Sequence, residues 1–92
     1  MPQLSEGELS TALSDLTDWS AAGGTISKTY GFDNFVAAVA FVNRLAELAE
    51  AAGHHPDIDI RYNRVTIGLS THDEGGVTEK DLALAAQIEG AL

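Results

Sequence analysis

The chain has 92 residues, of which 45% are hydrophobic and 21% charged, and this composition predicts one globular domain spanning residues 1–92. Its formal net charge of −9, with five lysines and arginines in total, excludes the basic surface that nucleic-acid binding needs. There is no cysteine, no apolar run of the ~20 residues that a membrane span requires, and no signal-peptide pattern. We therefore expect a cytoplasmic protein with neither a nucleic-acid nor a membrane partner.

The first part of the chain predicts a short helix followed by a hairpin. Ser5 and Glu8 have the spacing of a capping box, in which each side chain bonds the backbone N–H of the other residue. The glycine pair at 23–24 separates two extended runs, at 19–21 and 25–30. Such a pair is typical of a tight β-turn, so these runs are expected to form a hairpin.

The longest helix is predicted to begin after Asp33, a favourable N-cap, and to continue through about Ala52. Its apolar residues recur at helical spacing but cover a wide part of its surface. We therefore expect the sheet to cover one side of this helix and a partner subunit to cover another. Gly53 is a plausible C′ residue, the position just beyond the end of this helix, and Pro56 prevents the helix from continuing.

Two strands follow, because apolar residues alternate with polar ones in 57–62 and again in 65–72. We interpret Asn63-Arg64 as the turn between them, which pairs Ile60 with Ile67 and places the large apolar residues on one face.

The final helix is predicted to begin at Thr78, with Asp81 at the capping-box position. Its expected buried stripe consists of Leu82, Leu84, Ala85 and Ile88. The complete order is helix, two strands, helix, two strands, helix. It predicts an α+β fold, a four-stranded antiparallel sheet with helices packed on one face.

All three histidines of the chain are expected to gather at one end of this sheet. In the predicted register His55 lies opposite His72, and Glu50 precedes His54 by one helical turn. The loop into the final helix brings Asp81 nearby. Imidazoles beside carboxylates suit proton transfer near neutral pH, and they also suit metal binding.

The spacing of these residues resembles the signature of the pterin-4a-carbinolamine dehydratases. The residues that carry the resemblance are Glu50-x3-His54-His55-Pro56-x5-Tyr62-x9-His72-x8-Asp81. The predicted order of elements also agrees with that family's fold over essentially the whole chain. Tyr62 belongs to this motif by its spacing, although the predicted register puts it on the apolar face of the sheet.

The resemblance implies a lyase that dehydrates 4a-hydroxytetrahydropterin, a carbinolamine, to quinonoid dihydropterin and water during pterin recycling. It implies histidine acid–base catalysis without a metal or another cofactor. The implied catalytic residues are His54, His55, His72 and Glu50, with Glu50 assisting His54. The implied substrate-binding residues are Asp81, His55, Ser70 and Thr71, and Asp81 would hold either a histidine or the pterin edge. Where animal members have Asp, Trp and Arg, this chain has Gly53, Ile58 and Lys80.

Two other functions fit the same residues. Three histidines and a carboxylate could form a zinc or iron site, or the fold could serve as a non-catalytic oligomeric module that binds another protein. For a chain this small, oligomerisation is a natural source of stability, so we expect a homodimer or homotetramer. The resemblance also implies functional coupling to an aromatic amino-acid hydroxylase, which supplies the carbinolamine.

Overall fold

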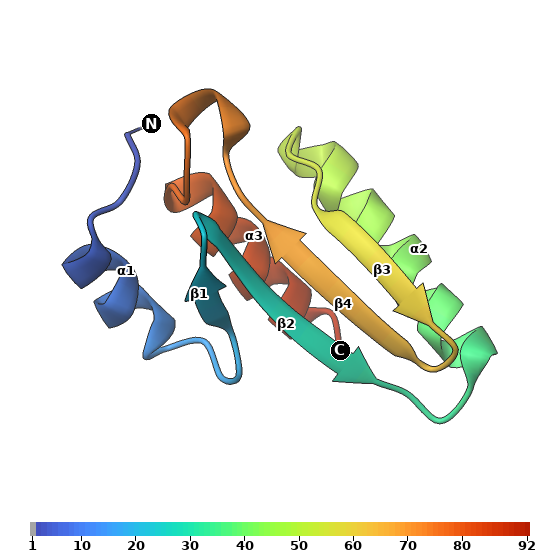
Figure 1. The fold of residues 1–92 in the computed structure, drawn as a ribbon. Helices are drawn as coiled ribbons and strands as arrows, with labels where there is room; N and C mark the ends of the chain where they lie inside the picture. Colours follow the sequence, from blue (N-terminus) through green and yellow to red (C-terminus); the bar gives the residue numbers. More distant parts are fainter. Residues whose placement is uncertain (1) are drawn as a thin grey trace.

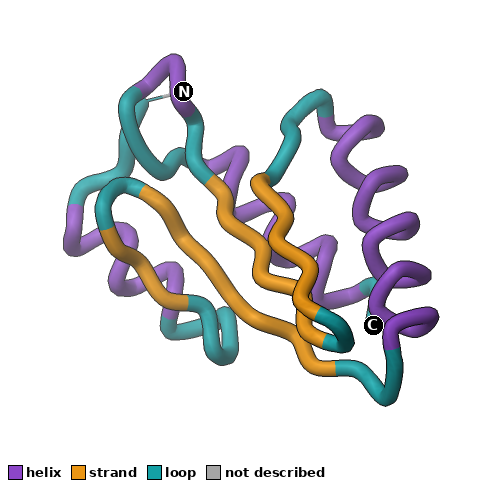
Figure 2. Tube along the Cα trace, turned by 45° about the vertical axis from the view of Figure 1, so that its right-hand side comes forward, coloured by secondary structure: helices purple, strands orange, loops and turns teal. Residues whose placement is uncertain are grey.

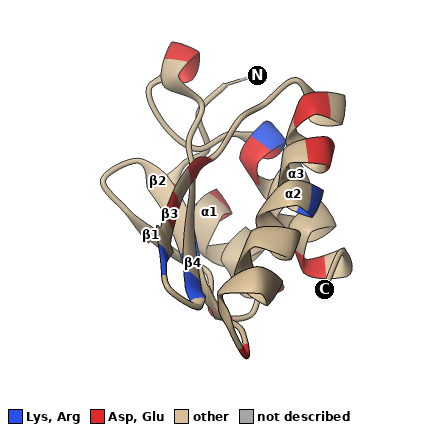
Figure 3. Ribbon diagram, turned by 90° about the vertical axis from the view of Figure 1, so that its right-hand side faces the viewer, with Lys and Arg blue, Asp and Glu red and all other residues tan. Residues whose placement is uncertain are grey.

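The computed structural model, which describes residues 2–92, contains three α-helices and four β-strands in the predicted order, together with one short 3-10 helix that was not predicted (Figure 1). The elements are α1 (Glu6–Leu13), β1 (Ser20–Ala22), β2 (Thr25–Gly31), α2 (Phe35–Ala52), β3 (Asp57–Arg61), β4 (Arg64–Leu69), η1 (His72–Glu74) and α3 (Glu79–Gly90). The strands form one antiparallel sheet in the order β1-β2-β4-β3. Figure 3 shows the helices on one side of it, which confirms the predicted α+β fold.

The core forms where the inward face of the two central strands meets the helices. Alternation along β4 buries Val65, Ile67 and Leu69, and the helices supply Leu45 from α2 and Leu84 from α3. Each fully buried side chain of this size contributes roughly 1.5–3 kcal/mol. These side chains pack between the sheet and the helices, and the twist of the sheet is visible in Figure 2.

Two of the predicted helix starts are confirmed. The backbone N–H of Ser5 donates to Glu8 Oε1 at 2.9 Å, and that of Glu8 donates to Ser5 Oγ at 3.2 Å. Thr78 and Asp81 form the second capping box, at the start of α3.

The prediction that Asp33 caps α2 is wrong. Asn34 is the N-cap, and its Oδ1 accepts a hydrogen bond from the backbone N–H of Ala37 at 2.8 Å. Asp and Asn are equally good caps, so two such neighbours leave the first residue of the helix ambiguous by one position.

The β3–β4 hairpin differs from the predicted register by two residues. Ile60 pairs with Val65 rather than Ile67, so the turn consists of Tyr62-Asn63. A shift of two residues leaves every side chain on the same face, and apolar alternation cannot distinguish the two registers. The observed one is held by Asn63, whose Nδ2 donates to the carbonyl of Phe32 at 2.7 Å.

Three site predictions that depended on this hairpin need correction. Tyr62 is not on the apolar face: it lies in the turn with a positive φ of 55° and is 68% exposed. β4 ends at Leu69, and His72 begins η1 instead of extending the strand. The pairing of His55 with His72 is therefore wrong.

β3 is an edge strand, and Ile58 and Ile60 each remain 39% exposed. Their alternation with charged residues predicted that these two side chains are buried.

Within residues 2–92, no helix is both long and apolar enough to cross a bilayer.

Candidate active site

A cavity of about 320 Å³ lies at the end of the sheet where β3 begins and β4 ends. Its lining includes His54, His55, Ser70, Thr71, His72 and Lys80. These residues come from the α2–β3 connection, the segment after β4 and the first turn of α3. A larger cavity, of about 530 Å³, lies between α1 and the β1–β2 hairpin, but no titratable imidazole lines it. We place the candidate site in the smaller cavity because the acid–base groups are there.

The end of α2 determines where the paired histidines lie. Gly53 adopts a left-handed φ of 63°, and the backbone N–H of His54 closes the helix by donating to the carbonyl of Ala49 at 3.2 Å. The chain then turns away from the helix axis, and Pro56 leads into β3. His54 consequently points towards α3 and not along the face of α2.

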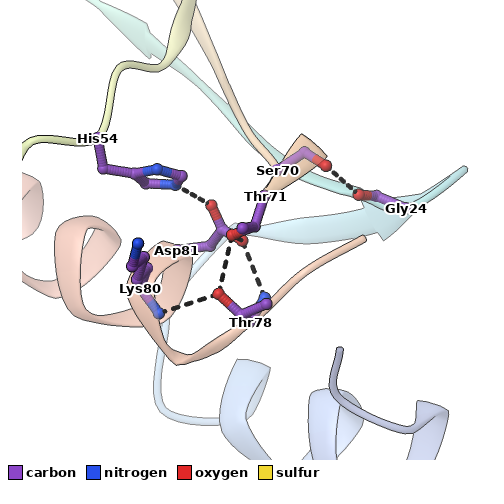
Figure 4. Close-up of polar contacts among 7 residues, drawn as sticks. All are labelled: Gly24, His54, Ser70, Thr71, Thr78, Lys80 and Asp81. Atoms are coloured by element: carbon purple, nitrogen blue, oxygen red, sulfur yellow. Dashed lines mark hydrogen bonds and ion pairs between the residues drawn. The ribbon is translucent and has the colours of Figure 1, made fainter. Parts of the chain in front are cut away.

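His54 meets Asp81 at the edge of the cavity (Figure 4). Its Nε2 lies 2.5 Å from Asp81 Oδ1, and their side chains are 12% and 0% exposed. Asp81 Oδ2 accepts two further bonds of 2.9 Å, from the backbone N–H of Thr78 and the hydroxyl of Thr71. Burying a carboxylate costs folding free energy unless hydrogen-bond donors replace the water around it. His54, Thr71 and the backbone of Thr78 supply these donors.

Glu50 does not contact His54 as predicted. Its Oε1 lies 2.6 Å from the Nε2 of His55, in a pair whose side chains are 78% and 62% exposed. The prediction assumed that helical geometry continues to residue 54, whereas α2 ends at Ala52. Water competes for an ion pair this exposed, so it contributes little to folding stability.

The other predicted site residues differ in how they face the cavity. His72 is exposed and makes no side-chain hydrogen bond within residues 2–92. The hydroxyl of Ser70 donates to the carbonyl of Gly24 at 2.8 Å, and that of Thr71 is directed to Asp81. Both residues line the cavity, but each hydroxyl already donates a hydrogen bond within the protein.

The imidazoles of the site differ in their carboxylate partners. Two of the three imidazoles are each paired with one carboxylate, His54 with Asp81 and His55 with Glu50. In the part of the chain that the structure describes, no three His, Cys, Asp or Glu side chains are grouped to hold a metal ion. Neutral imidazole offers one donor and one acceptor, and the carboxylate partner decides which nitrogen donates.

A family model described as Pterin 4 alpha carbinolamine dehydratase matches residues 2–91. The chain belongs to this family. A protein of Chloroflexus aurantiacus, provisionally named pterin-4-alpha-carbinolamine dehydratase, is 60% identical over 89 residues and covers 97% of this chain and 96% of its own length. One from Acidobacterium capsulatum with the same provisional name is 54% identical over all 92 residues, which are 100% of both chains.

Two solved structures of pterin dehydratase type are similar to the chain. A transcriptional coactivator/pterin dehydratase from Brucella melitensis is 36% identical and has a TM-score of 0.92, and the match covers 96% of each chain. A pterin dehydratase-like protein identified as a RuBisCO assembly factor in the alpha-carboxysome is 26% identical, with a TM-score of 0.65 over 78% of this chain and 83% of its own. Proteins similar to this family member therefore carry names for more than one function.

Sequence reasoning missed two residues of the site in this pterin dehydratase family member. Asp73 lines the cavity together with Gly53 and Lys80, the two positions already noted as departures from animal members, and Thr78 contacts both Thr71 and Asp81. A signal existed for Thr78, because the residue that caps the helix carrying Asp81 must approach that carboxylate. Asp73 follows His72 in η1, a turn that the strand-like pattern of 65–72 concealed.

Proposed function

We propose that the chain catalyses dehydration of a 4a-hydroxytetrahydropterin to quinonoid dihydropterin and water. Membership of the family supplies the reaction class, and the observation that carries the proposal is the buried pairing of Asp81 with His54 beside a cavity lined by all three histidines. A carboxylate with no contact to solvent is positioned there to orient an imidazole. Such orientation is what general base catalysis requires.

The reaction needs two proton transfers, which the residues of the cavity match. The C4a hydroxyl leaves as water when an imidazolium donates a proton to it, and a ring-nitrogen proton passes to a neutral imidazole. We assign the second role to His54, whose Nε2 is held by Asp81. We assign the donor role and contacts with the pterin to His72 and His55, with Glu50 orienting His55. As the C4a–O bond breaks, the electrons of the ring N–H bond form the new C=N double bond. The elimination needs no oxidant or reductant, so the proposed mechanism uses neither a metal nor another cofactor.

Direct measurement of dehydration tests this proposal. The carbinolamine is generated in place by an aromatic amino-acid hydroxylase, and formation of quinonoid dihydropterin is followed by its absorbance with and without the protein. We expect acceleration by the wild-type protein, and a loss of roughly a hundredfold or more in His54→Ala and His72→Ala. Glu47→Gln, an exposed change on α2, serves as the matched control and should retain full activity.

Absence of any acceleration, or His54→Ala and His72→Ala with wild-type rates, would contradict the enzymatic proposal. It would favour a non-catalytic module that binds another protein, and one similar protein is described as a RuBisCO assembly factor. We further propose that the chain works as a homodimer or homotetramer, supported by the exposed apolar residues Phe35 and Val36 on α2. A hydroxylase that releases the carbinolamine is the functional partner consistent with this chemistry.

A further inference from the structure

The buried threonines beside Asp81 form a connected set of hydrogen bonds that the acid–base mechanism above does not use. Thr71 is 8% exposed, and Thr78 and Asp81 are 0% exposed. The hydroxyl of Thr71 lies 2.8 Å from that of Thr78 and 2.9 Å from Asp81 Oδ2 (Figure 4). Because water does not reach these atoms, each hydrogen bond must be made within the protein.

The direction of the hydroxyl bonds follows from counting protons. Thr71 has one hydroxyl proton, which it donates to Asp81 because an ionised carboxylate only accepts. The bond between the two threonines must then be donated by Thr78. The Thr78 oxygen in turn accepts from the backbone N–H of Lys80 at 3.3 Å. Donation therefore runs in one direction, from Thr78 to Thr71 to Asp81.

This arrangement has a consequence at the opposite oxygen of the carboxylate. Asp81 Oδ2 is occupied by Thr71 and the backbone of Thr78, which leaves Oδ1 to accept from His54 Nε2. A neutral His54 must then carry its proton on Nε2 and its lone pair on Nδ1. The His55–Glu50 pair has no comparable support, because both side chains are mostly exposed and water can replace either partner.

We propose that Thr71, supported by Thr78, is a positioning residue that fixes the Nε2–H tautomer of His54 through Asp81 and makes Nδ1 the proton acceptor in dehydration. The role of Nδ1 rests on the function proposed above, whereas the tautomer does not. Thr71 thereby acts through Asp81 and not through contact of its hydroxyl with the pterin. Its β-branched side chain has few rotamers, which suits a hydroxyl that must keep one direction.

The experiment compares Thr71→Val, which removes the hydroxyl at nearly constant shape, with Thr71→Ser, which retains it. The chain offers a matched control in Thr66→Val, because Thr66 forms the same kind of hydroxyl pair with Thr29, at 2.8 Å but on the exposed face of the sheet. For each protein, the His54 tautomer is read from imidazole ¹⁵N chemical shifts in two-dimensional NMR at a pH where the ring is neutral. Dehydration is measured in parallel as kcat/KM.

We expect the Nε2–H tautomer in the wild-type protein, and a mixture with Nδ1–H in Thr71→Val. The kcat/KM of Thr71→Val should fall roughly ten- to a hundredfold, the effect of losing one hydrogen bond to a charged group. Thr71→Ser should restore both readouts, and Thr66→Val should leave both unchanged.

Three results would overturn the positioning role. The first is an Nδ1–H tautomer of His54 in the wild-type protein, a result that does not depend on any variant folding. The other two are an unchanged tautomer in Thr71→Val and a failure of Thr71→Ser to restore the wild-type readouts. If the tautomer responds as expected while the wild-type protein fails to accelerate dehydration, the positioning role stands and the proposed function fails. The two proposals are thus tested separately.

Discussion

Lys28 is a charged residue on the inward face of β2, opposite the buried Ile67 of β4. Its side chain is only 12% exposed, and its Nζ donates to Glu89 Oε1 at 2.8 Å and to the carbonyl of Thr17 at 2.9 Å. The hydroxyl of Tyr30 donates to the other oxygen of Glu89. These bonds compensate for removing the charge from water and connect β2 to the last turn of α3.

This contact predicts how stability depends on pH. Burial raises the pKa of the Glu89 carboxyl, but hydrogen bonds from Lys28 and Tyr30 outweigh it, so that its pKa lies below the ordinary value of 4.5. A carboxyl whose pKa is lowered by folding contributes stability above its unfolded pKa and loses it as the pH falls through the folded pKa. Glu89→Gln should therefore lower the free energy of unfolding by about 1–2 kcal/mol near pH 7, and by less below pH 4.

Urea unfolding of both proteins across this pH range measures the difference. Glu47→Gln removes an exposed carboxylate from α2 and should change the free energy of unfolding by less than about 0.5 kcal/mol at every pH. A difference between Glu89→Gln and wild type that does not shrink in acid would show that the carboxylate charge is not what stabilises this contact.

The pairing of each histidine illustrates what residue spacing can predict and what it cannot. The spacing of the three histidines correctly placed them around one cavity. It assigned Glu50 to His54, because residues four apart share a helix face. The actual partner of His54 is Asp81, 27 residues away, and that contact depends on how α3 packs beside the end of α2. Partners from separate elements are set by packing, which local spacing does not encode.

At the scale of elements, the order, type and antiparallel arrangement of the strands follow from period-two alternation and turn residues. The glycine pair between β1 and β2 has positive φ at both positions, 60° and 79°, as the predicted tight turn requires. The β3–β4 turn lacks such a signal, because Tyr62 is a residue that rarely adopts positive φ. The tertiary bonds between Asn63 and Phe32 decide its position instead.

The end of α2 offers a test in which one chemical change has opposite effects in two elements. Gly53 has a φ of 63°, which is unfavourable for alanine, whereas Gly7 lies within α1, where alanine is favourable. A Cβ at either position meets no atom within 4 Å, so only the backbone conformation differs. Gly53→Ala should lower the free energy of unfolding by about 1–2 kcal/mol. Gly7→Ala should raise it by about 0.5 kcal/mol.

Denaturant unfolding of the two variants and the wild-type protein provides the comparison. Gly53→Asn should fall between Gly53→Ala and wild type, because asparagine tolerates the left-handed region. Equal stabilities of Gly53→Ala and wild type would mean that α2 ends in another conformation, and the placement of His54 would have to be revised.

At the scale of the whole molecule, exposed apolar side chains gather on one side. Within residues 2–92, six large apolar residues are exposed, and five of them belong to α2, β3 or the turn after β3. We refer to these five as the α2–β3 surface. The five residues are Phe35, Val36, Ile58, Ile60 and Tyr62. Figure 1 shows α2 beside β3, whose outer edge has no neighbouring strand in the sheet. Apolar side chains beside an open strand edge are typical of a surface covered by another chain.

Self-association through the α2–β3 surface should depend on salt as well as concentration. Each copy carries a formal charge of −9, so two copies repel at low ionic strength, and added salt should strengthen an association driven by apolar contacts. Light scattering after size-exclusion chromatography measures the mass, which is 9.7 kDa for one chain. We expect a dimer or tetramer in the wild-type protein, with a larger assembled fraction at higher salt.

Val36→Asp should shift this equilibrium towards single chains, because it places a charge at a position that is 75% exposed in one chain and would be covered in the assembly. Aspartate in the first turn of α2 is compatible with the helix, so folding should persist. Ser10→Asp adds the same charge to α1, which Figure 1 shows beside β1 at the opposite edge of the sheet, and should leave the mass unchanged. A single-chain mass for the wild-type protein at every concentration and salt would contradict self-association. Equal effects of the two variants would instead attribute the change to net charge, because only a contact at the α2–β3 surface distinguishes residue 36 from residue 10.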